Sequence, residues 1–281
     1  MKYALGNMLN GIGVTGLDPT AKSYIAAVVA AGATVTATQR NAINAFVKSE
    51  KAVSRWTMQK RLYLPIWGVA APNAIDMVGL TSGSFVGGVT HTTGYVTTNG
   101  TSGHFISDVS VGGAGCTLNG TGAYALYTSA TSLLLVNSQT YLGSQNSDNG
   151  TRVRLSGGSA DSSRFAFFGP NSGSFSTILT VGDQRGIQFL GRDTSTNRFV
   201  VLRQGSNLLS QNQSNTSSAL NSTIPMCWLA NNNNGTVANY TATTARLGAA
   251  GMTEGMSRAN AEAFTVNLKT LWETCTGFTL P

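Results

Sequence analysis

The sequence has few charged residues. Only 10% of its 281 residues are Asp, Glu, Lys or Arg, well below the usual quarter. Its surface must therefore be wetted mainly by hydroxyl and amide groups, which satisfy turns locally and do not depend on salt bridges that ions screen. This composition is typical of extracellular β-proteins. Because hydrophobic residues make up 41% of the chain, it can still bury a globular core.

Cysteine is scarce, and long apolar runs are absent. Cys116, Cys227 and Cys275 lie far apart and form no Cys-x-x-Cys pair, which predicts buried free thiols. No run reaches the ~18 apolar residues that a membrane helix needs. The apolar stretch in residues 1–13 is too short for a signal peptide. We therefore expect no membrane span, and release from a cell by lysis or within an assembly.

Acidic residues are outnumbered by basic ones, 11 to 18, which gives a net charge of +7. The basic residues are scattered, and their densest cluster, residues 48–61, is interpreted as a solvated helix face, with docking onto an acidic surface as the alternative. No strand interleaves them with aromatic residues, so we do not expect nucleic acid as a partner. We expect ordinary solvated side chains for the arginines that could line a sheet rim, which are Arg152, Arg154, Arg192, Arg198 and Arg203.

Residues 17–68 have the spacing of helices. Asp18 can cap a first helix, Pro19 suits its first position, and Gly32 can end it in a left-handed conformation. Thr36 and Gln39 have capping-box spacing at the start of a second helix. The predicted apolar stripes are Tyr24, Ile25, Val28 and Val29 in the first helix, and Ile43, Phe46 and Val47 in the second. A third short helix is expected within residues 54–68, closed by Pro65.

From about residue 73 to 250 the period changes to that of strands. Short β-branched or aromatic segments such as "AYALYTS", "GIQFLGR" and "NRFVVLRQ" are separated by Gly, Asn or Ser. This spacing leaves no room for crossover helices, which predicts antiparallel sheets in a sandwich or jelly roll. "NGT" occurs at residues 99, 119, 149 and 234, where Asn-Gly suits tight turns, although each is also a glycosylation sequon.

A C-terminal helix is predicted over about residues 257–274, capped by Ser257 and ended by Gly277. The residues expected to face inward are Ala263, Phe264, Val266, Leu268 and Leu271. The predicted organisation is a flexible attachment segment (1–16), a helical segment (17–68) and a sandwich with this helix (69–281). The fold class is therefore mainly β, an antiparallel jelly-roll sandwich flanked by helices.

Both histidines lie in one polar stretch, "THTTGYVTTNGTSGHF", residues 90–105. His91 and His104 flank a predicted hairpin turn at Asn99-Gly100 and could lie close together. Two imidazoles do not make a zinc site, which takes three or four ligands, and the nearest further candidate is Asp108. We expect the histidines to form hydrogen bonds at a sheet corner, with no metal and no cofactor.

The carboxylates show no catalytic pattern. Glycoside hydrolysis needs two carboxylates about 5 to 9 Å apart, and no Glu-x-Asp-x-x-Glu strand is present. The glutamates, Glu50, Glu254, Glu262 and Glu273, fall outside the predicted strands. The aspartates considered, Asp108, Asp148, Asp161, Asp183 and Asp193, are isolated. The stretch 144–151 has one carboxylate and is interpreted as a turn, with calcium binding as the alternative. The sequence thus predicts no catalytic residues and a protein that is not an enzyme.

Sugar binding needs exposed aromatic faces beside amide and hydroxyl groups. The chain is rich in amide and hydroxyl groups. Its aromatic candidates are Tyr95, Tyr124, Tyr127, Tyr141, Trp228 and Tyr240. Because most of them alternate in strands with the inward period, core packing is the preferred interpretation, and no binding site is predicted.

Four stretches carry a family resemblance: residues 21–47, "RLYLPIWGVAAPNAIDMVGL", "GGVTHTTGYVTTNGTSGHF" and "NLKTLWETCTGFTLP". The chain resembles bacteriophage proteins with a concanavalin A-like (LamG-like) jelly-roll domain, encoded among virion structural genes. Residues 140–220 match only in strand rhythm. The resemblance implies a virion component, displayed on head or tail.

Three hypotheses for function follow. The first is a structural virion protein acting by adhesion and support, bound to other virion proteins through residues 1–16 or the helical segment, and assembled as a homo-oligomer. The second is a receptor-binding module that recognises a host surface glycan. The third is a polysaccharide depolymerase, in which replacing Asp108 or Asp183 would abolish activity.

Overall fold

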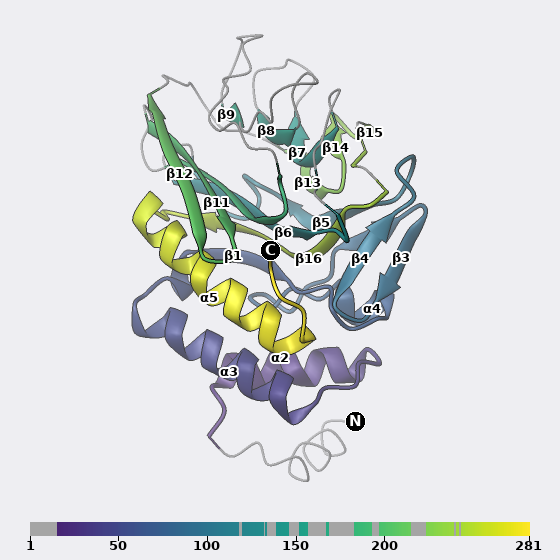
Figure 1. The fold of residues 1–281 in the computed structure, drawn as a ribbon, viewed down its shortest axis with the longest axis vertical. Coiled ribbons are helices and arrows are strands. Elements are labelled where there is room, and N and C mark those ends of the chain that lie inside the picture. Colours follow the sequence, from purple (N-terminus) through teal and green to yellow (C-terminus); the bar gives the residue numbers. More distant parts are fainter. Residues whose placement is uncertain are drawn as a thin grey trace.

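The computed structural model describes residues 16–117, 120–131, 133, 139–145, 152–156, 167–168, 183–192, 197–214, 223–238, 240–241 and 243–281. They form three layers (Figure 1): a layer of helices, a sheet that the helices cover, and a second sheet on the far side of the first. The predicted sandwich flanked by N- and C-terminal helices is confirmed. Apart from Gly16, the predicted attachment segment lies outside the described residues.

The helix-covered sheet has eight strands in the order β12-β11-β10-β6-β16-β4-β3, with β1 also paired to β16. Every strand pair in it is antiparallel. Its strands are β1 (Gln59–Tyr63), β3 (Val89–Thr92), β4 (Tyr95–Thr98), β6 (Thr121–Thr128), β10 (Gly186–Arg192), β11 (Asn197–Gln204), β12 (Asn207–Ser214) and β16 (Arg246–Glu254).

The second sheet, called the outer sheet here, also has eight strands, in the order β15-β14-β7-β13-β5-β2, with β8 and β9 added beyond β7. Its strands are β2 (Ser84–Val86), β5 (His104–Ser110), β7 (Thr140–Gln145), β8 (Arg152–Ser156), β9 (Phe167–Phe168), β13 (Pro225–Trp228), β14 (Asn231–Asn233) and β15 (Thr236–Ala238). The expectation of wholly antiparallel sheets is wrong at one place, because β14 and β7 are parallel.

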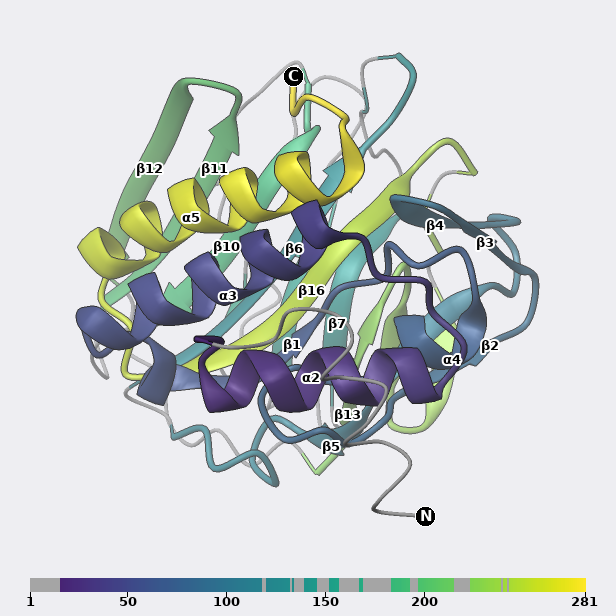
Figure 2. The ribbon, with the colours of Figure 1, turned by 90° about the horizontal axis from the view of Figure 1, so that it is seen from below.

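Three long helices, α2 (Pro19–Ala30), α3 (Ala37–Ala52) and α5 (Arg258–Thr276), lie side by side across the helix-covered sheet (Figure 2). Their predicted starts are confirmed: Asp18 accepts from the Thr20 amide, Thr36 and Gln39 form the capping box, and Ser257 caps α5. A short helix, α4 (Ala70–Asn73), follows β1. None of the helices in the described ranges combines the length and apolar character that crossing a bilayer requires.

The predicted third helix is wrong. Residues Trp56–Met58 form one 3-10 turn, and the chain then enters β1. Leu62 and Tyr63 are both fully buried, but Leu62 packs beneath the helices and Tyr63 between the sheets. Only an extended strand turns adjacent side chains to opposite faces, so pairing with β16 replaces helix formation here.

The predicted inner face of α5 is partly wrong. Phe264, Leu268 and Leu271 are buried as expected, whereas Ala263 and Val266 are exposed. Trp272 and Cys275 are buried in their place. The buried stripe therefore follows the i, i+4, i+7, i+8, i+11 spacing from Phe264, which a packed helix requires.

Two cores hold the layers together. Between the sheets lie aromatic side chains that include Tyr63, Phe105 and Trp228, while the core beneath the helices includes Tyr24, Phe189 and Trp272. The three cysteines are buried free thiols, as predicted.

The predicted Asn-Gly turns differ in what they connect. Asn234 and Gly235 both have positive φ, 51° and 85°, and join β14 to β15 as a hairpin. Gly100 also has positive φ, but the turn at Asn99 connects β4 of one sheet to β5 of the other, so it is not the expected hairpin. The "NGT" sites at residues 119 and 149 lie partly or wholly outside the described residues.

Candidate functional site

The two histidines do not form one site. His91 Nδ1 lies 3.0 Å from Asn73 Nδ2, and its ring contacts Phe85 edge-on. His104 Nδ1 lies 2.8 Å from the Ser102 carbonyl oxygen. Burial lowers the pKa of both imidazoles, so both are neutral at pH 7. In the part of the chain that the structure describes, no group of three metal-ligating side chains is found.

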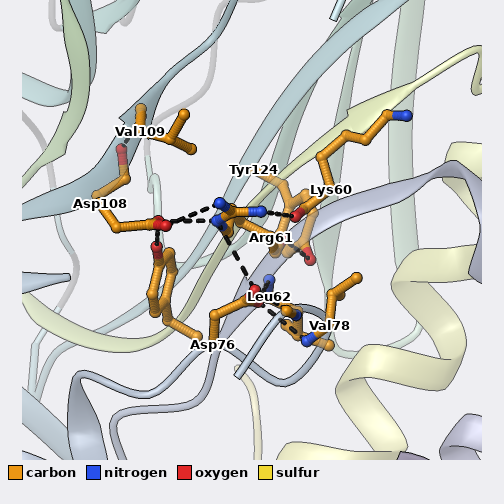
Figure 3. A network of polar contacts seen from close by, with 11 residues as sticks. Lys60, Arg61, Leu62, Asp76, Val78, Asp108, Val109 and Tyr124 are labelled. Atoms are coloured by element: carbon orange, nitrogen blue, oxygen red, sulfur yellow. Dashed lines mark hydrogen bonds and ion pairs between the residues drawn. The ribbon is translucent and has the colours of Figure 1, made fainter. Parts of the chain in front are cut away.

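Asp108 belongs to a charged cluster that joins the two sheets (Figure 3). Arg61 on β1 donates two 2.7 Å hydrogen bonds to its carboxylate, and Tyr63 Oη donates a third of the same length. Asp76, which the sequence reasoning missed, also lies near Arg61, with its Oδ2 3.7 Å from Arg61 Nε. The Asp76 carboxylate accepts hydrogen bonds from the backbone amides of Leu62, Val78 and Gly79.

The protonation states in this cluster suit a structural role. Burial disfavours the Asp108 anion, but hydrogen bonds from Arg61 and Tyr63 lower its pKa to about 2. Burial raises the pKa of Asp76, against the three amides that favour its ionised form. Asp108 is therefore held as the anion by Arg61 and Tyr63, and the Asp76 side chain has no exposed surface.

The remaining carboxylates are also engaged. Asp183 accepts from the Arg185 side chain, and buried Glu50 accepts two bonds from Arg55. Glu254, Glu262 and Glu273 each accept a hydrogen bond from a protein group. Asp148, Asp161 and Asp193 lie outside the described residues, as does most of the stretch 144–151.

The expectation of solvated arginines is wrong for three of the five. Arg192 and Arg198, which face each other across β10 and β11, are buried, and so is Arg203. Arg203 donates to Thr265 Oγ1 and to the Glu262 carbonyl on α5, which explains its burial. The side chains of Arg152 and Arg154 are outside the described set. Arg192, Arg198 and Arg203, the three with described side chains, therefore form no open basic rim.

Most aromatic candidates belong to the core. Tyr124, Tyr127, Tyr141 and Trp228 have no exposed surface. Only Tyr95 and Tyr240 are partly exposed. The centre of the Tyr240 ring lies 5.9 Å from the centre of the His104 ring. Tyr95 belongs to a larger group of side chains.

That group, the aromatic platform, consists of Tyr95, Thr97, Arg246 and Phe278. The Arg246 guanidinium lies 4.6 Å from the centre of the Tyr95 ring, and the Phe278 ring is 6.1 Å from it. Thr97 is the cross-strand partner of Arg246, so their side chains share a face. Phe278 is 45% exposed. Among the described residues, no carboxylate lies within ion-pair distance of Arg246.

The end of α5 creates this platform. Gly277 takes φ 74° and ends the helix, and the next residue, Phe278, lies beside Tyr95 at the start of β4. Phe278 then folds back to stack on Trp272, 6.0 Å away. A hydrophobic residue after a left-handed C-terminal glycine commonly packs on the last turn, and this was the one sequence signal that could have found Phe278.

The Phe278 ring lies so close to Gly94 that no side chain fits at this position. The φ of Gly94 is 98°, and a Cβ placed there would lie 2.6 Å from Phe278 Cε2. The turn is held from both sides, since Gly94 N donates to Ile66 O and Trp272 Nε1 donates to Gly94 O. The platform is therefore preformed, with an aromatic face, a hydroxyl and an arginine whose donors point to no protein acceptor in the described part of the chain.

No family profile matches this sequence, and the comparison with curated proteins found no match. Solved structures with a similar fold include domain 4 of AbnA, an extracellular arabinanase from Geobacillus stearothermophilus, in complex with arabinotriose. It is 9% identical with a TM-score of 0.49, over 74% of this chain and 98% of that one. A Trypanosoma rangeli sialidase with sialic acid is 14% identical with a TM-score of 0.45, over 75% of this chain and 32% of that one. The lumenal domain of VIP36, bound to calcium and Man3GlcNAc, is 10% identical with a TM-score of 0.37, over 60% of this chain and 84% of that one.

These matches contradict the prediction that the chain is not an enzyme, because they include an arabinanase domain and a sialidase. At these identities the matches concern the fold, and the chain spans about a third of the sialidase. They assign neither a reaction nor a substrate to this chain.

Proposed function

We propose that this chain is a glycan-binding module whose site is the aromatic platform. The observation that carries the proposal is Arg246, held over the Tyr95 ring beside half-exposed Phe278. Sugar rings stack their C–H faces on aromatic side chains, and their hydroxyls accept from guanidinium groups. The solved structures of similar fold contain arabinotriose, sialic acid and Man3GlcNAc, which is in keeping with this ligand class.

Arg246 narrows the ligands that suit the platform. A guanidinium with no carboxylate partner among the described residues offers a planar fork of donors to a ligand. A carboxylate-bearing sugar would occupy that fork with two charge-assisted bonds, while a neutral sugar would use its hydroxyls. The net charge of +7 favours the approach of an acidic polysaccharide.

A glycan array probed with the full chain tests the proposal. We expect signals that disappear in Phe278→Ala and Tyr95→Ala and persist in Tyr240→Ala, the matched control at the other partly exposed tyrosine. Silence of the intact chain on neutral and acidic glycans alike would refute it, as would equal loss in all three variants. Incubating each bound glycan with the chain and assaying new reducing ends measures cleavage separately from binding.

We also propose that the module is carried on a bacteriophage particle, on head or tail, where it attaches to other virion proteins through residues 1–16 or the helical segment. The support is the sequence resemblance to phage jelly-roll proteins. Mass spectrometry of purified particles and electron microscopy with a labelled antibody test the location. Unchanged incorporation after deletion of residues 1–16 would refute attachment through that segment.

A further inference from the structure

β12 is an unusually open sheet edge. It is the last strand of the helix-covered sheet, and within the described residues it pairs only with β11, residue for residue over all eight positions. Five of its first six residues are exposed, Leu208 and Leu209 to 39% and 40%. One edge of its backbone therefore presents amides and carbonyls to solvent, flanked by two leucines.

The other described edges are much shorter. β3 has four residues, β2 and β15 have three each, and β9 has two. Natural sheets limit edge-to-edge pairing by short edge strands, charged side chains, proline or bulges. β12 has none of these protections: its sequence, NLLSQNQS, holds no charge and no proline, and its pairing with β11 shows no shift in register.

We infer that β12 pairs with β12 of a second copy of this chain across a two-fold axis, which extends the helix-covered sheet through the dimer. A strand is self-complementary when it is antiparallel to its own copy, because each copy offers the same donors and acceptors. The absence of charge removes the repulsion that would oppose pairing of identical strands.

The two leucines explain why a second copy suits this edge. Leu208 is the partner of Arg203, which bonds to α5, so Leu208 lies on the helix side. Leu209 pairs with Leu202, which belongs to the core between the sheets, so it lies on the other side. A strand added at the edge removes apolar surface from water on both faces.

Light scattering of the full chain during size-exclusion chromatography tests the inference. We expect twice the 29.2 kDa of the monomer. The double variant Leu209→Lys with Gln211→Lys places like charges on one face of the paired strands and should give the monomer mass. Val86→Lys is the matched control, since Val86 is 42% exposed on the short edge strand β2, and its mass should stay that of the dimer.

A mixing experiment separates loss of pairing from misfolding. The Leu209→Glu with Gln211→Glu variant should also be a monomer, and an equal mixture with the lysine variant should recover the dimer mass. A monomeric wild type at all concentrations would overturn the inference. So would a lysine variant that stays dimeric, or a mixture of folded variants that fails to associate.

Discussion

Arg61 on β1 and Asp108 on β5 join the two sheets of the sandwich through a pair of 2.7 Å hydrogen bonds. The salt bridge has only 17% of each side chain exposed. Replacing Asp108 by Asn leaves the Arg61 charge without its main partner, and charge-assisted bonds of this kind contribute about 1.5–3 kcal/mol. We expect Asp108→Asn to lower the free energy of unfolding by about 2 kcal/mol, as measured by urea denaturation at pH 7.

The same pair predicts a dependence on pH. The Asp108 pKa is lowered from 3.8 to about 2, so the folded state favours the anion. The stabilisation is complete above the unfolded value and is lost as the pH falls from about 4 towards 2. The difference in unfolding free energy between wild type and Asp108→Asn should therefore shrink over this window. A difference that is constant from pH 7 to pH 2 would contradict the assigned pKa.

Gly94 is expected to affect glycan binding because the Phe278 ring occupies the space that a side chain at position 94 would need. Gly94→Ala combines a residue of positive φ with a Cβ 2.6 Å from the Phe278 ring. Gly32→Ala is the matched control, since its φ is 102° and nothing lies within 4 Å of the added Cβ. Both should lose about 1 kcal/mol of stability from backbone strain. Only Gly94→Ala should displace Phe278 and weaken glycan binding, measured by isothermal titration. Equal affinity in the two variants would argue against Phe278 as a binding surface.

Arg246 is expected to act through its charge and its planar fork of donors. Arg246→Gln should weaken binding of a carboxylate-bearing glycan at least about tenfold, because a charge-assisted bond contributes about 1.5–3 kcal/mol and about 1.4 kcal/mol corresponds to a tenfold change. Arg246→Lys should recover only part of the affinity, because an ammonium cannot form the bidentate pair. Lys22 is an exposed residue on α2, so Lys22→Gln removes the same net charge and should change affinity little. If Lys22→Gln weakens binding as much, the effect is that of overall charge.

Local patterns predicted most of the architecture, whereas the platform could not be predicted. Caps such as Asp18 and Ser257 act within one turn, so their effect is visible in a few residues. Tyr95, Arg246 and Phe278 come from β4, β16 and the C-terminal tail, and no local pattern relates them. The burial of Arg192 and Arg198 is equally non-local, because it depends on what covers their sheet. Sequence alone showed the elements but not which faces they leave open.

The face of α5 gives a direct test of such a non-local effect. Val266 was expected inside but is 44% exposed, whereas Leu268 is fully buried under the helix layer. The two positions are about 200° apart on the helix, so only one can face the sheet. Leu268→Ala should lower the free energy of unfolding by about 2–5 kcal/mol through the lost apolar contact and the cavity left behind. Val266→Ala should stay within about 0.5 kcal/mol of wild type, as exposed substitutions do. Urea denaturation of both variants decides between the two faces, and a larger loss for Val266→Ala would mean that α5 is rotated from the position described.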